Sequence, residues 1–135
     1  MGIEFEHVSK RYPDGTVAVD DFSLTVPTGR FTVLVGSSGS GKTTLLRMVN
    51  RMVTPTAGRV LIDDEDIAGT DPVKLRRRIG YVMQNSGLLP HRRVLDNIAT
   101  VPRLNGVGRR EAQSRALDLM DLVGLDRSMA RRWPE

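Results

Sequence analysis

The chain has 135 residues, of which 39% are hydrophobic, and this length and composition suit one domain with its own core. Cysteine is absent, which excludes disulfides and thiolate metal sites. No apolar run approaches the roughly 18 residues of a membrane helix, and the acidic start Met1–Glu6 predicts neither a signal peptide nor a basic transit segment.

Charge is divided unevenly along the chain. Residues 1–73 hold 7 lysines and arginines against 10 acidic residues, whereas residues 74–135 hold 13 against 6. A basic half can indicate nucleic acid, an anionic membrane surface or an acidic partner. The arginines are scattered and are not interleaved with aromatic residues, so solvated arginine-rich helix faces explain the bias equally well. We expect no nucleic-acid partner.

The first elements have the pattern of strands followed by a helix. Ile3–Tyr12 and Val17–Val26 read as two strands, joined by a turn at Pro13–Thr16 in which proline presets φ and glycine takes the awkward position. The apolar, β-branched run Phe31–Val35 predicts a third strand, and the residues from Thr44 to Asn50 have helical spacing.

Further along, the pattern changes from strands to helices. Arg59–Asp63 and Ile79–Gln84 predict strands, and between them Asp71 and Pro72 form a helix start that leads to Arg78. Beyond Pro90 we expect helices over Val94–Ala99 and Arg109–Val123, the second ending at Gly124. The apolar face of the second helix is expected to carry Ala116, Leu119, Met120 and Val123.

Residues 36–43 match the G-x-x-x-x-G-K-[ST] pattern of a phosphate-binding loop. The predicted strand before the motif and the predicted helix after it are the context that it requires. Glycines let successive backbone N–H groups point inward, and the helix that follows adds a partial positive charge. A flexible glycine- and serine-rich turn is the alternative, but it would not explain the lysine–threonine pair.

The motif assigns a role to each side chain that carries chemistry. Lys42 would span the β- and γ-phosphates, the Thr43 hydroxyl would ligate Mg²⁺, and the Thr44 hydroxyl would reach the α-phosphate. The candidate nucleotide-binding residues of the loop are Gly36, Ser37, Ser38, Gly39, Ser40, Gly41, Lys42, Thr43 and Thr44.

With this phosphate loop, the chain resembles the amino-terminal part of an ATP-binding cassette (ABC) transporter nucleotide-binding subunit. The resemblance extends over the whole length of the chain. The resemblance implies that Tyr12 stacks on adenine, although it could be an ordinary strand aromatic. It also implies that Gln84 senses Mg²⁺ and the γ-phosphate, although it could be a surface strand end. Three stretches are similar to the osmoprotectant branch, which imports glycine betaine, choline, carnitine or proline: Met48–Pro55, Asp71–Tyr81 and Gly87–His91.

Two features that look chemical receive no role. His91 is expected to be a loop residue near the contact with the membrane subunits, because the family's switch histidine comes much later. The acidic run Asp63–Asp66 resembles a metal site only superficially. In the family it lies at a hairpin turn, where Asp64 replaces the more usual glycine and tolerates a left-handed conformation.

The motifs that the family places after a segment like Arg131–Glu135 do not occur in the chain. They are the L-S-G-G-Q signature, the acidic strand with the hydrolytic glutamate, and the switch histidine. We therefore interpret the chain as a fragment of a longer subunit. It should bind ATP without turning it over, because the group that orients the attacking water is missing.

The resemblance implies an α/β phosphate-loop NTPase fold: a parallel core sheet, an antiparallel β region at the start and the beginning of an α-helical subdomain. Residues 1–86 would belong to the ATPase core and residues 87–135 to the helical subdomain. The full subunit would use ATP and Mg²⁺ on the inner face of the cell membrane. Its partners would be membrane subunits, a second ATP-binding subunit and, indirectly, an external solute-binding protein.

Two other classes share the phosphate loop. A stand-alone kinase or GTPase is one, but it would normally open with the loop strand, whereas two strands precede the loop here. A non-transport ABC protein that acts on DNA or ribosomes is the other, and it would suit the basic second half. The resemblance also places most neighbours of Phe31–Val35 beyond residue 135, so we expect this strand to form an exposed edge that associates or leaves the chain marginally stable.

Overall fold

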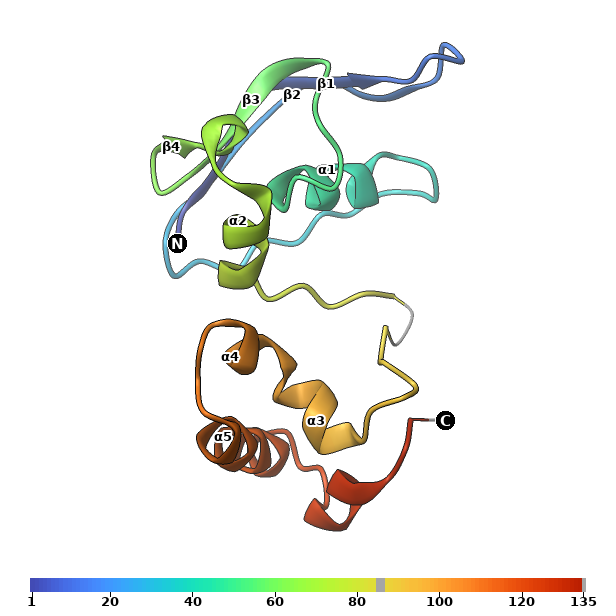
Figure 1. The fold of residues 1–135 in the computed structure, drawn as a ribbon. Helices are drawn as coiled ribbons and strands as arrows, with labels where there is room; N and C mark the ends of the chain where they lie inside the picture. The colour runs from blue at the N-terminus through green and yellow to red at the C-terminus, as the bar shows by residue number, and fades with distance from the viewer. Residues whose placement is uncertain (85–86, 135) are drawn as a thin grey trace. The chain divides into compact units, whose positions relative to one another are not determined.

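The computed structural model describes residues 1–84 and 87–134 (Figure 1). Its contacts group the chain into two compact units, Met1–Ile79 and Gly80–Glu135. The division falls earlier than the domain boundary expected between residues 86 and 87, and that boundary stays a prediction. In the described residues, no helix is long and apolar enough to cross a membrane.

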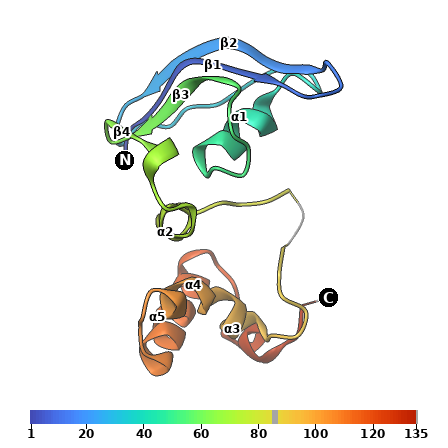
Figure 2. The same cartoon turned by 45° about the horizontal axis from the view of Figure 1, so that its top comes forward.

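The first unit is built on an antiparallel sheet with the strand order β2-β1-β3-β4 (Figure 2). Its strands are β1 (Ile3–Arg11), β2 (Val17–Val26), β3 (Ala57–Ile62) and β4 (Glu65–Asp66). The predicted first hairpin is confirmed. Its turn is closed by the Tyr12 N–H, which donates to the Thr16 carbonyl at 2.8 Å, and Gly15 takes a φ of 85°.

Backbone irregularities fall on the three long strands. His7 in β1 and Asp21 in β2 have positive φ values of 49° and 44°, and Gly58 in β3 has a φ of 74°. A Cβ at Gly58 would lie 2.2 Å from the His7 carbonyl oxygen, so only glycine fits there. The β1–β2 and β1–β3 registers both shift here, as β-bulges require.

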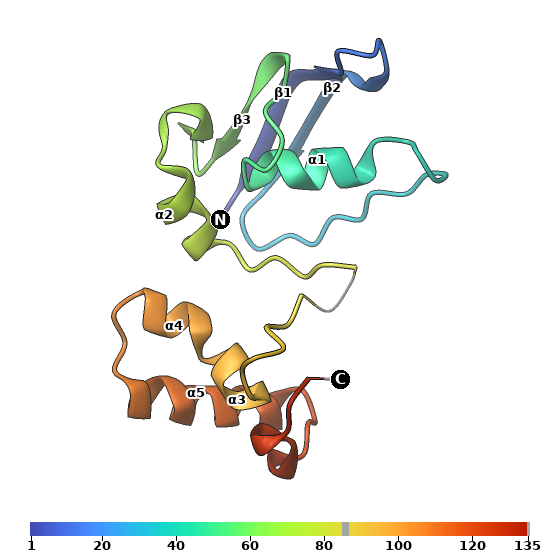
Figure 3. The ribbon, with the colours of Figure 1, turned by 45° about the vertical axis from the view of Figure 1, so that its right-hand side comes forward.

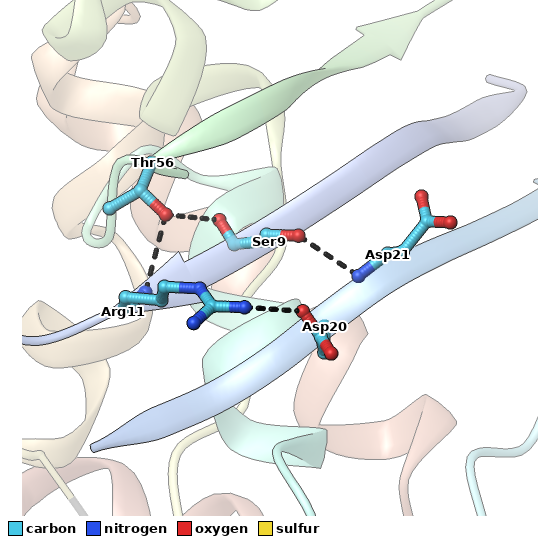
Figure 4. Close-up of polar contacts among 5 residues, drawn as sticks. All are labelled: Ser9, Arg11, Asp20, Asp21 and Thr56. Atoms are coloured by element: carbon cyan, nitrogen blue, oxygen red, sulfur yellow. Dashed lines mark hydrogen bonds and ion pairs between the residues drawn. The ribbon is translucent and has the colours of Figure 1, made fainter. Parts of the chain in front are cut away.

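Side chains replace the ladder bonds that the bulges remove (Figure 4). The Ser9 hydroxyl accepts the Asp21 N–H at 2.9 Å. The Thr56 hydroxyl donates to the Ser9 carbonyl at 3.0 Å and accepts the Arg11 N–H at 3.2 Å. The Arg11 guanidinium also pairs with the Asp20 carboxylate at 3.1 Å. These contacts hold together the end of the sheet from which the first hairpin turn projects.

Helix α1 (Lys42–Val49) packs against one face of this sheet (Figure 3). Leu45, Met48 and Val49 are buried on the helix, and the Phe5 ring meets the Phe22 ring edge-on at 5.6 Å between centroids. The helix and the sheet therefore share one core, whose buried residues are Phe5, Val8, Val19, Leu45, Met48, Val49, Val60, Ile62, Ile67 and Leu75.

The first unit ends with two short helical elements. The 3₁₀ turn η1 (Ile67–Gly69) precedes α2 (Pro72–Arg78), whose predicted start is confirmed. The Asp71 carboxylate accepts the Lys74 N–H at 2.8 Å, and this bond holds the pKa of Asp71 below its ordinary value. Asp64 has a φ of 65°, so its predicted left-handed conformation is also confirmed.

The second unit contains α3 (Val94–Ile98), α4 (Thr100–Leu104), α5 (Arg109–Leu122) and the 3₁₀ turn η2 (Arg127–Arg131). Its core is formed by small side chains, Ala99, Ala112 and Ala116. The apolar face predicted for α5 is wrong in part, because Leu119 and Val123 are exposed while Ala116 and Met120 are buried. The buried face of α5 instead includes Ala112, which packs with Ala99 in the core of this unit. The helix α5 contacts both α3 and α4.

Two predicted strands, Phe31–Val35 and Ile79–Gln84, are absent from the structure. A strand needs a hydrogen-bonded partner, and in the described part of the chain neither segment pairs with another. Leu34 packs against the core of the first unit, whereas Phe31 and Val35 are 92% and 90% exposed. The segment 31–35 is therefore apolar and open to pairing.

We predict that the 135-residue chain associates through residues 31–35, because exposed apolar segments with unpaired backbone groups recruit other chains. Val35→Lys should reduce association measured by light scattering, since a lysine disfavours edge pairing. Leu122→Lys, a change at a 79% exposed leucine of α5, is the matched control and should have no effect. A stable monomer at high concentration, with slowly exchanging Val33 and Val35 amides, would contradict the prediction.

Candidate functional site

The phosphate loop and α1 form a continuous structure that begins at Gly36. The loop turns at residues 37–40, where the Ser40 N–H donates to the Ser37 carbonyl at 3.3 Å and Gly39 has a φ of 84°. Helix α1 starts immediately afterwards, and its N-cap residue Gly41 is left-handed, with a φ of 85°. The glycines thus occupy conformations that residues with a Cβ rarely adopt.

The Lys42 side chain, from the first residue of α1, folds back onto the phosphate loop. Its Nζ donates to the Gly36 carbonyl at 2.8 Å, to the Ser37 carbonyl at 2.6 Å and to the Ser40 hydroxyl at 3.1 Å. These acceptors are neutral, so the positive charge of the lysine is solvated but not neutralised. An anion at this place would meet an unpaired cation.

The N-terminus of α1 adds to this positive field. Among the described residues, no side chain caps it, and its first turn has no acidic residue. Its first N–H groups therefore keep their hydrogen-bonding capacity, together with about half a positive charge from the helix dipole. The Thr43 side chain is exposed and Thr44 is half-buried at this end of the helix.

A pocket of about 140 Å³ lies against these residues. Ala18 of β2 forms one part of its wall, and the loop and first helical turn form the rest: Gly39, Ser40, Gly41, Lys42, Thr43 and Thr44. A Cβ at Gly41 would lie 2.3 Å from the Ala18 carbonyl oxygen, so the loop approaches β2 as closely as a backbone can. The sheet therefore fixes where the loop sits.

Tyr12 is at the same end of the first hairpin as Ala18. It follows β1 directly, its side chain is half-exposed at 38%, and the Lys10 ammonium lies 5.3 Å from its ring centroid. Tyr12 does not line the pocket. Its link to the pocket is the first hairpin, which carries both Tyr12 and the lining residue Ala18. The exposed part of the ring is available for stacking on a planar group.

Gln84 is an exposed residue in the second unit, and its role as a sensor of Mg²⁺ and phosphate stays a prediction. His91 is also exposed there and lies in a turn. The acidic run at residues 63–66 is occupied by structural bonds: Asp63 accepts the Gly2 N–H at 2.7 Å and Asp66 accepts the Ala68 N–H at 2.8 Å. Among the described residues, no cluster of His, Cys, Asp and Glu could hold a metal ion.

One member of the site and one of its contacts follow only from the tertiary structure. Ala18 carries no functional signal in the sequence, because its contribution is a backbone carbonyl and a small wall. Ser40 is part of the motif, but the motif does not say that its hydroxyl binds the lysine. The Pro13–Thr16 turn is the nearest sequence signal, since it places Ala18 near the start of β2.

Comparison with known proteins explains why these features occur together. The family model described as ABC transporter matches residues 19–135. The chain belongs to the ABC transporter family. The predicted resemblance is therefore confirmed, and the fold is that of part of an ABC ATPase cassette.

ABC relatives cover almost all of the chain. It is 46% identical to the carnitine transport ATP-binding protein OpuCA of Listeria monocytogenes and 42% identical to the choline transport ATP-binding protein OpuBA of Bacillus subtilis. Both alignments span 98% of the chain, but only 33% and 35% of the relatives. The chain thus spans about a third of the length of these curated ABC proteins.

An ABC structure matches the fold as well. The ATP-binding cassette MJ0796, solved as a dimer in a post-hydrolysis state bound to ADP and Pi, has a TM-score of 0.90 and 29% identity to the chain. The match covers 98% of this chain and 61% of that cassette. The fold of the chain is therefore that of part of an ABC cassette.

The close approach of the loop to β2 gives a prediction with an internal control. Gly39→Ala forces a left-handed alanine into open space and should cost about 1 kcal/mol of stability. Gly41→Ala forces the same conformation and also a clash with the Ala18 carbonyl, so it should cost about 1–3 kcal/mol more. Urea unfolding of both variants measures the difference, and equal losses would show that the close approach is not real.

Proposed function

We propose that the chain binds ATP or ADP with Mg²⁺ at the phosphate loop, as the nucleotide-binding part of an ABC importer subunit. One observation carries the proposal: the Lys42 ammonium lies on neutral loop carbonyls beside a pocket at the uncapped N-terminus of α1. Such a site has donors and positive charge but no anion of its own, as a triphosphate requires.

The residues of the loop fit the charge of a nucleotide. Phosphate oxygens would compete with the Gly36 and Ser37 carbonyls for the Lys42 ammonium, and a charged acceptor forms the stronger bond. The Thr43 hydroxyl is exposed for Mg²⁺, and Thr44 is placed one residue further for the α-phosphate. When bound, Mg²⁺ would be held by the Thr43 hydroxyl and would neutralise part of the phosphate charge.

The complete candidate site extends beyond the loop. Tyr12, whose side chain is partly exposed, would stack on adenine. Gln84 would sense Mg²⁺ and the γ-phosphate in the assembled subunit, a role that its exposure allows. The nucleotide-binding residues that we propose are thus Tyr12, the loop residues 36–44 and Gln84.

In the full-length subunit, ATP binding and hydrolysis would drive the uptake of a quaternary-amine osmoprotectant. Relatives that are named carnitine and choline transport ATP-binding proteins support this solute class. The subunit would lie on the inner face of the cell membrane and act with membrane subunits, a second ATP-binding subunit and an external solute-binding protein. The dimeric cassette among the structural neighbours supports the pairing of two such subunits.

Nucleotide binding predicts a shift in thermal stability. Mg-ATP or Mg-ADP at 100 times its dissociation constant should stabilise the fold by about 2.7 kcal/mol, seen as a higher melting temperature. Lys42→Ala should abolish most of the shift, whereas Lys74→Ala, which removes an exposed lysine of α2, should preserve it. Equal shifts in wild type and Lys42→Ala would refute the assignment of the loop.

Hydrolysis should be absent from the 135-residue chain. The sequence contains no L-S-G-G-Q signature and no later acidic strand, and groups that act as a unit lose most of their catalysis when some are missing. A phosphate-release assay at several protein concentrations should show only background. Turnover that is lost in Lys42→Ala would show that these residues hydrolyse ATP by another arrangement.

A further inference from the structure

The C-terminal end of α1 is held by one arginine from the next helix. Arg76 of α2 donates from Nε to the Asn50 carbonyl at 2.9 Å and from Nη2 to the Arg51 carbonyl at 2.8 Å. These two carbonyls follow directly on α1, where helical partners run out. A guanidinium satisfies both at once, and its positive charge suits the negative end of the helix dipole.

A third hydrogen bond runs in the opposite direction. Arg51 donates from Nη1 to the Thr70 carbonyl, which lies just before the Asp71 N-cap of α2. Arg51 itself is left-handed, with a φ of 54°, so the chain bends sharply at the residue that makes this contact. The end of α1 and the start of α2 are thus tied by bonds from both sides.

Burial makes this connection stiff. Asn50 is 2% exposed and its side-chain oxygen accepts the Met52 N–H at 3.1 Å, so the carbonyl that Arg76 binds belongs to a fixed residue. Leu75, the residue before Arg76, is 3% exposed in the same core as Met48 of α1. The residue that accepts the Arg76 bond and the residue next to Arg76 are therefore both held by packing.

The two ends of α1 consequently serve different partners. Its N-terminus forms the phosphate loop site, and its C-terminus is clamped to α2, from which the chain continues through Ile79 to Gln84. We propose that Arg76 is a positioning residue that couples nucleotide binding at the loop to the placement of α2. The coupling travels through one short helix and three hydrogen bonds, and it rests on the proposed nucleotide binding.

Hydrogen exchange on the 135-residue chain, with and without saturating Mg-ADP, tests the coupling. In wild type, Mg-ADP should slow exchange of the Leu75 and Ile79 amides by about fivefold or more, the lower range of allosteric couplings. Arg76→Gln should keep protection at the loop and lose it at these two amides. By reciprocity, its affinity for Mg-ADP should fall by the same factor.

Two variants separate coupling from general loss of structure. Arg77→Gln removes an exposed guanidinium from the same helix that makes neither contact in the described residues, and it should behave as wild type. Arg76→Lys keeps the charge but cannot serve both carbonyls with a planar fork, so it should restore only part of the remote protection. Arg76→Lys also provides the test if Arg76→Gln does not fold.

The outcomes distinguish this inference from the proposed function. No binding of Mg-ADP by wild type would remove the proposed function and the coupling with it. Binding without protection at Leu75 and Ile79, or equal protection in wild type and in the folded Arg76 variants, would overturn the coupling alone. Loss of protection in Arg77→Gln as well would show that α2 responds to any lost charge.

Discussion

The site depends on the packing of α1 against the antiparallel sheet. Leu45 and Met48 are 5% and 1% exposed, and each fully buried side chain of this size contributes about 1.5–3 kcal/mol. This burial brings Gly41 against the Ala18 carbonyl, where a Cβ would lie at 2.3 Å. The glycine is thus required by its φ and by the space. If the helix moved away from the sheet, the pocket would lose the part of its wall that β2 forms. The loop would also lose its contact with the Ala18 carbonyl.

The loop supplies its own acceptors for the side chain of its lysine. Three neutral oxygens hold the Lys42 ammonium, which lines the pocket. Exchanging these acceptors for phosphate oxygens replaces neutral bonds with charge-assisted ones. At the opposite end of α1, Arg76 holds carbonyls in a comparable way. A cation therefore lies at each end of this short helix, Lys42 from the helix itself and Arg76 from α2.

The apolar segments outside the sheet are explained by comparison with the family. Phe31 and Val35 are almost fully exposed, and Val82 is 97% exposed, which is unusual for residues of this type. The chain covers 61% of the matched cassette and about a third of the curated relatives. These segments have the composition of buried strands but no strand partner in the described residues.

The sequence by itself determined the local features: the first hairpin, the phosphate loop, the Asp71 cap of α2 and the family. Each depends on residues close together in the chain, because turns, caps and glycine conformations are local. Tertiary structure decided what depends on distant partners. It left Phe31–Val35 unpaired, because a strand exists only beside another strand. It also placed Ala18 in the pocket and the Arg76 guanidinium on the end of α1, since only folding brings a distant backbone carbonyl within reach.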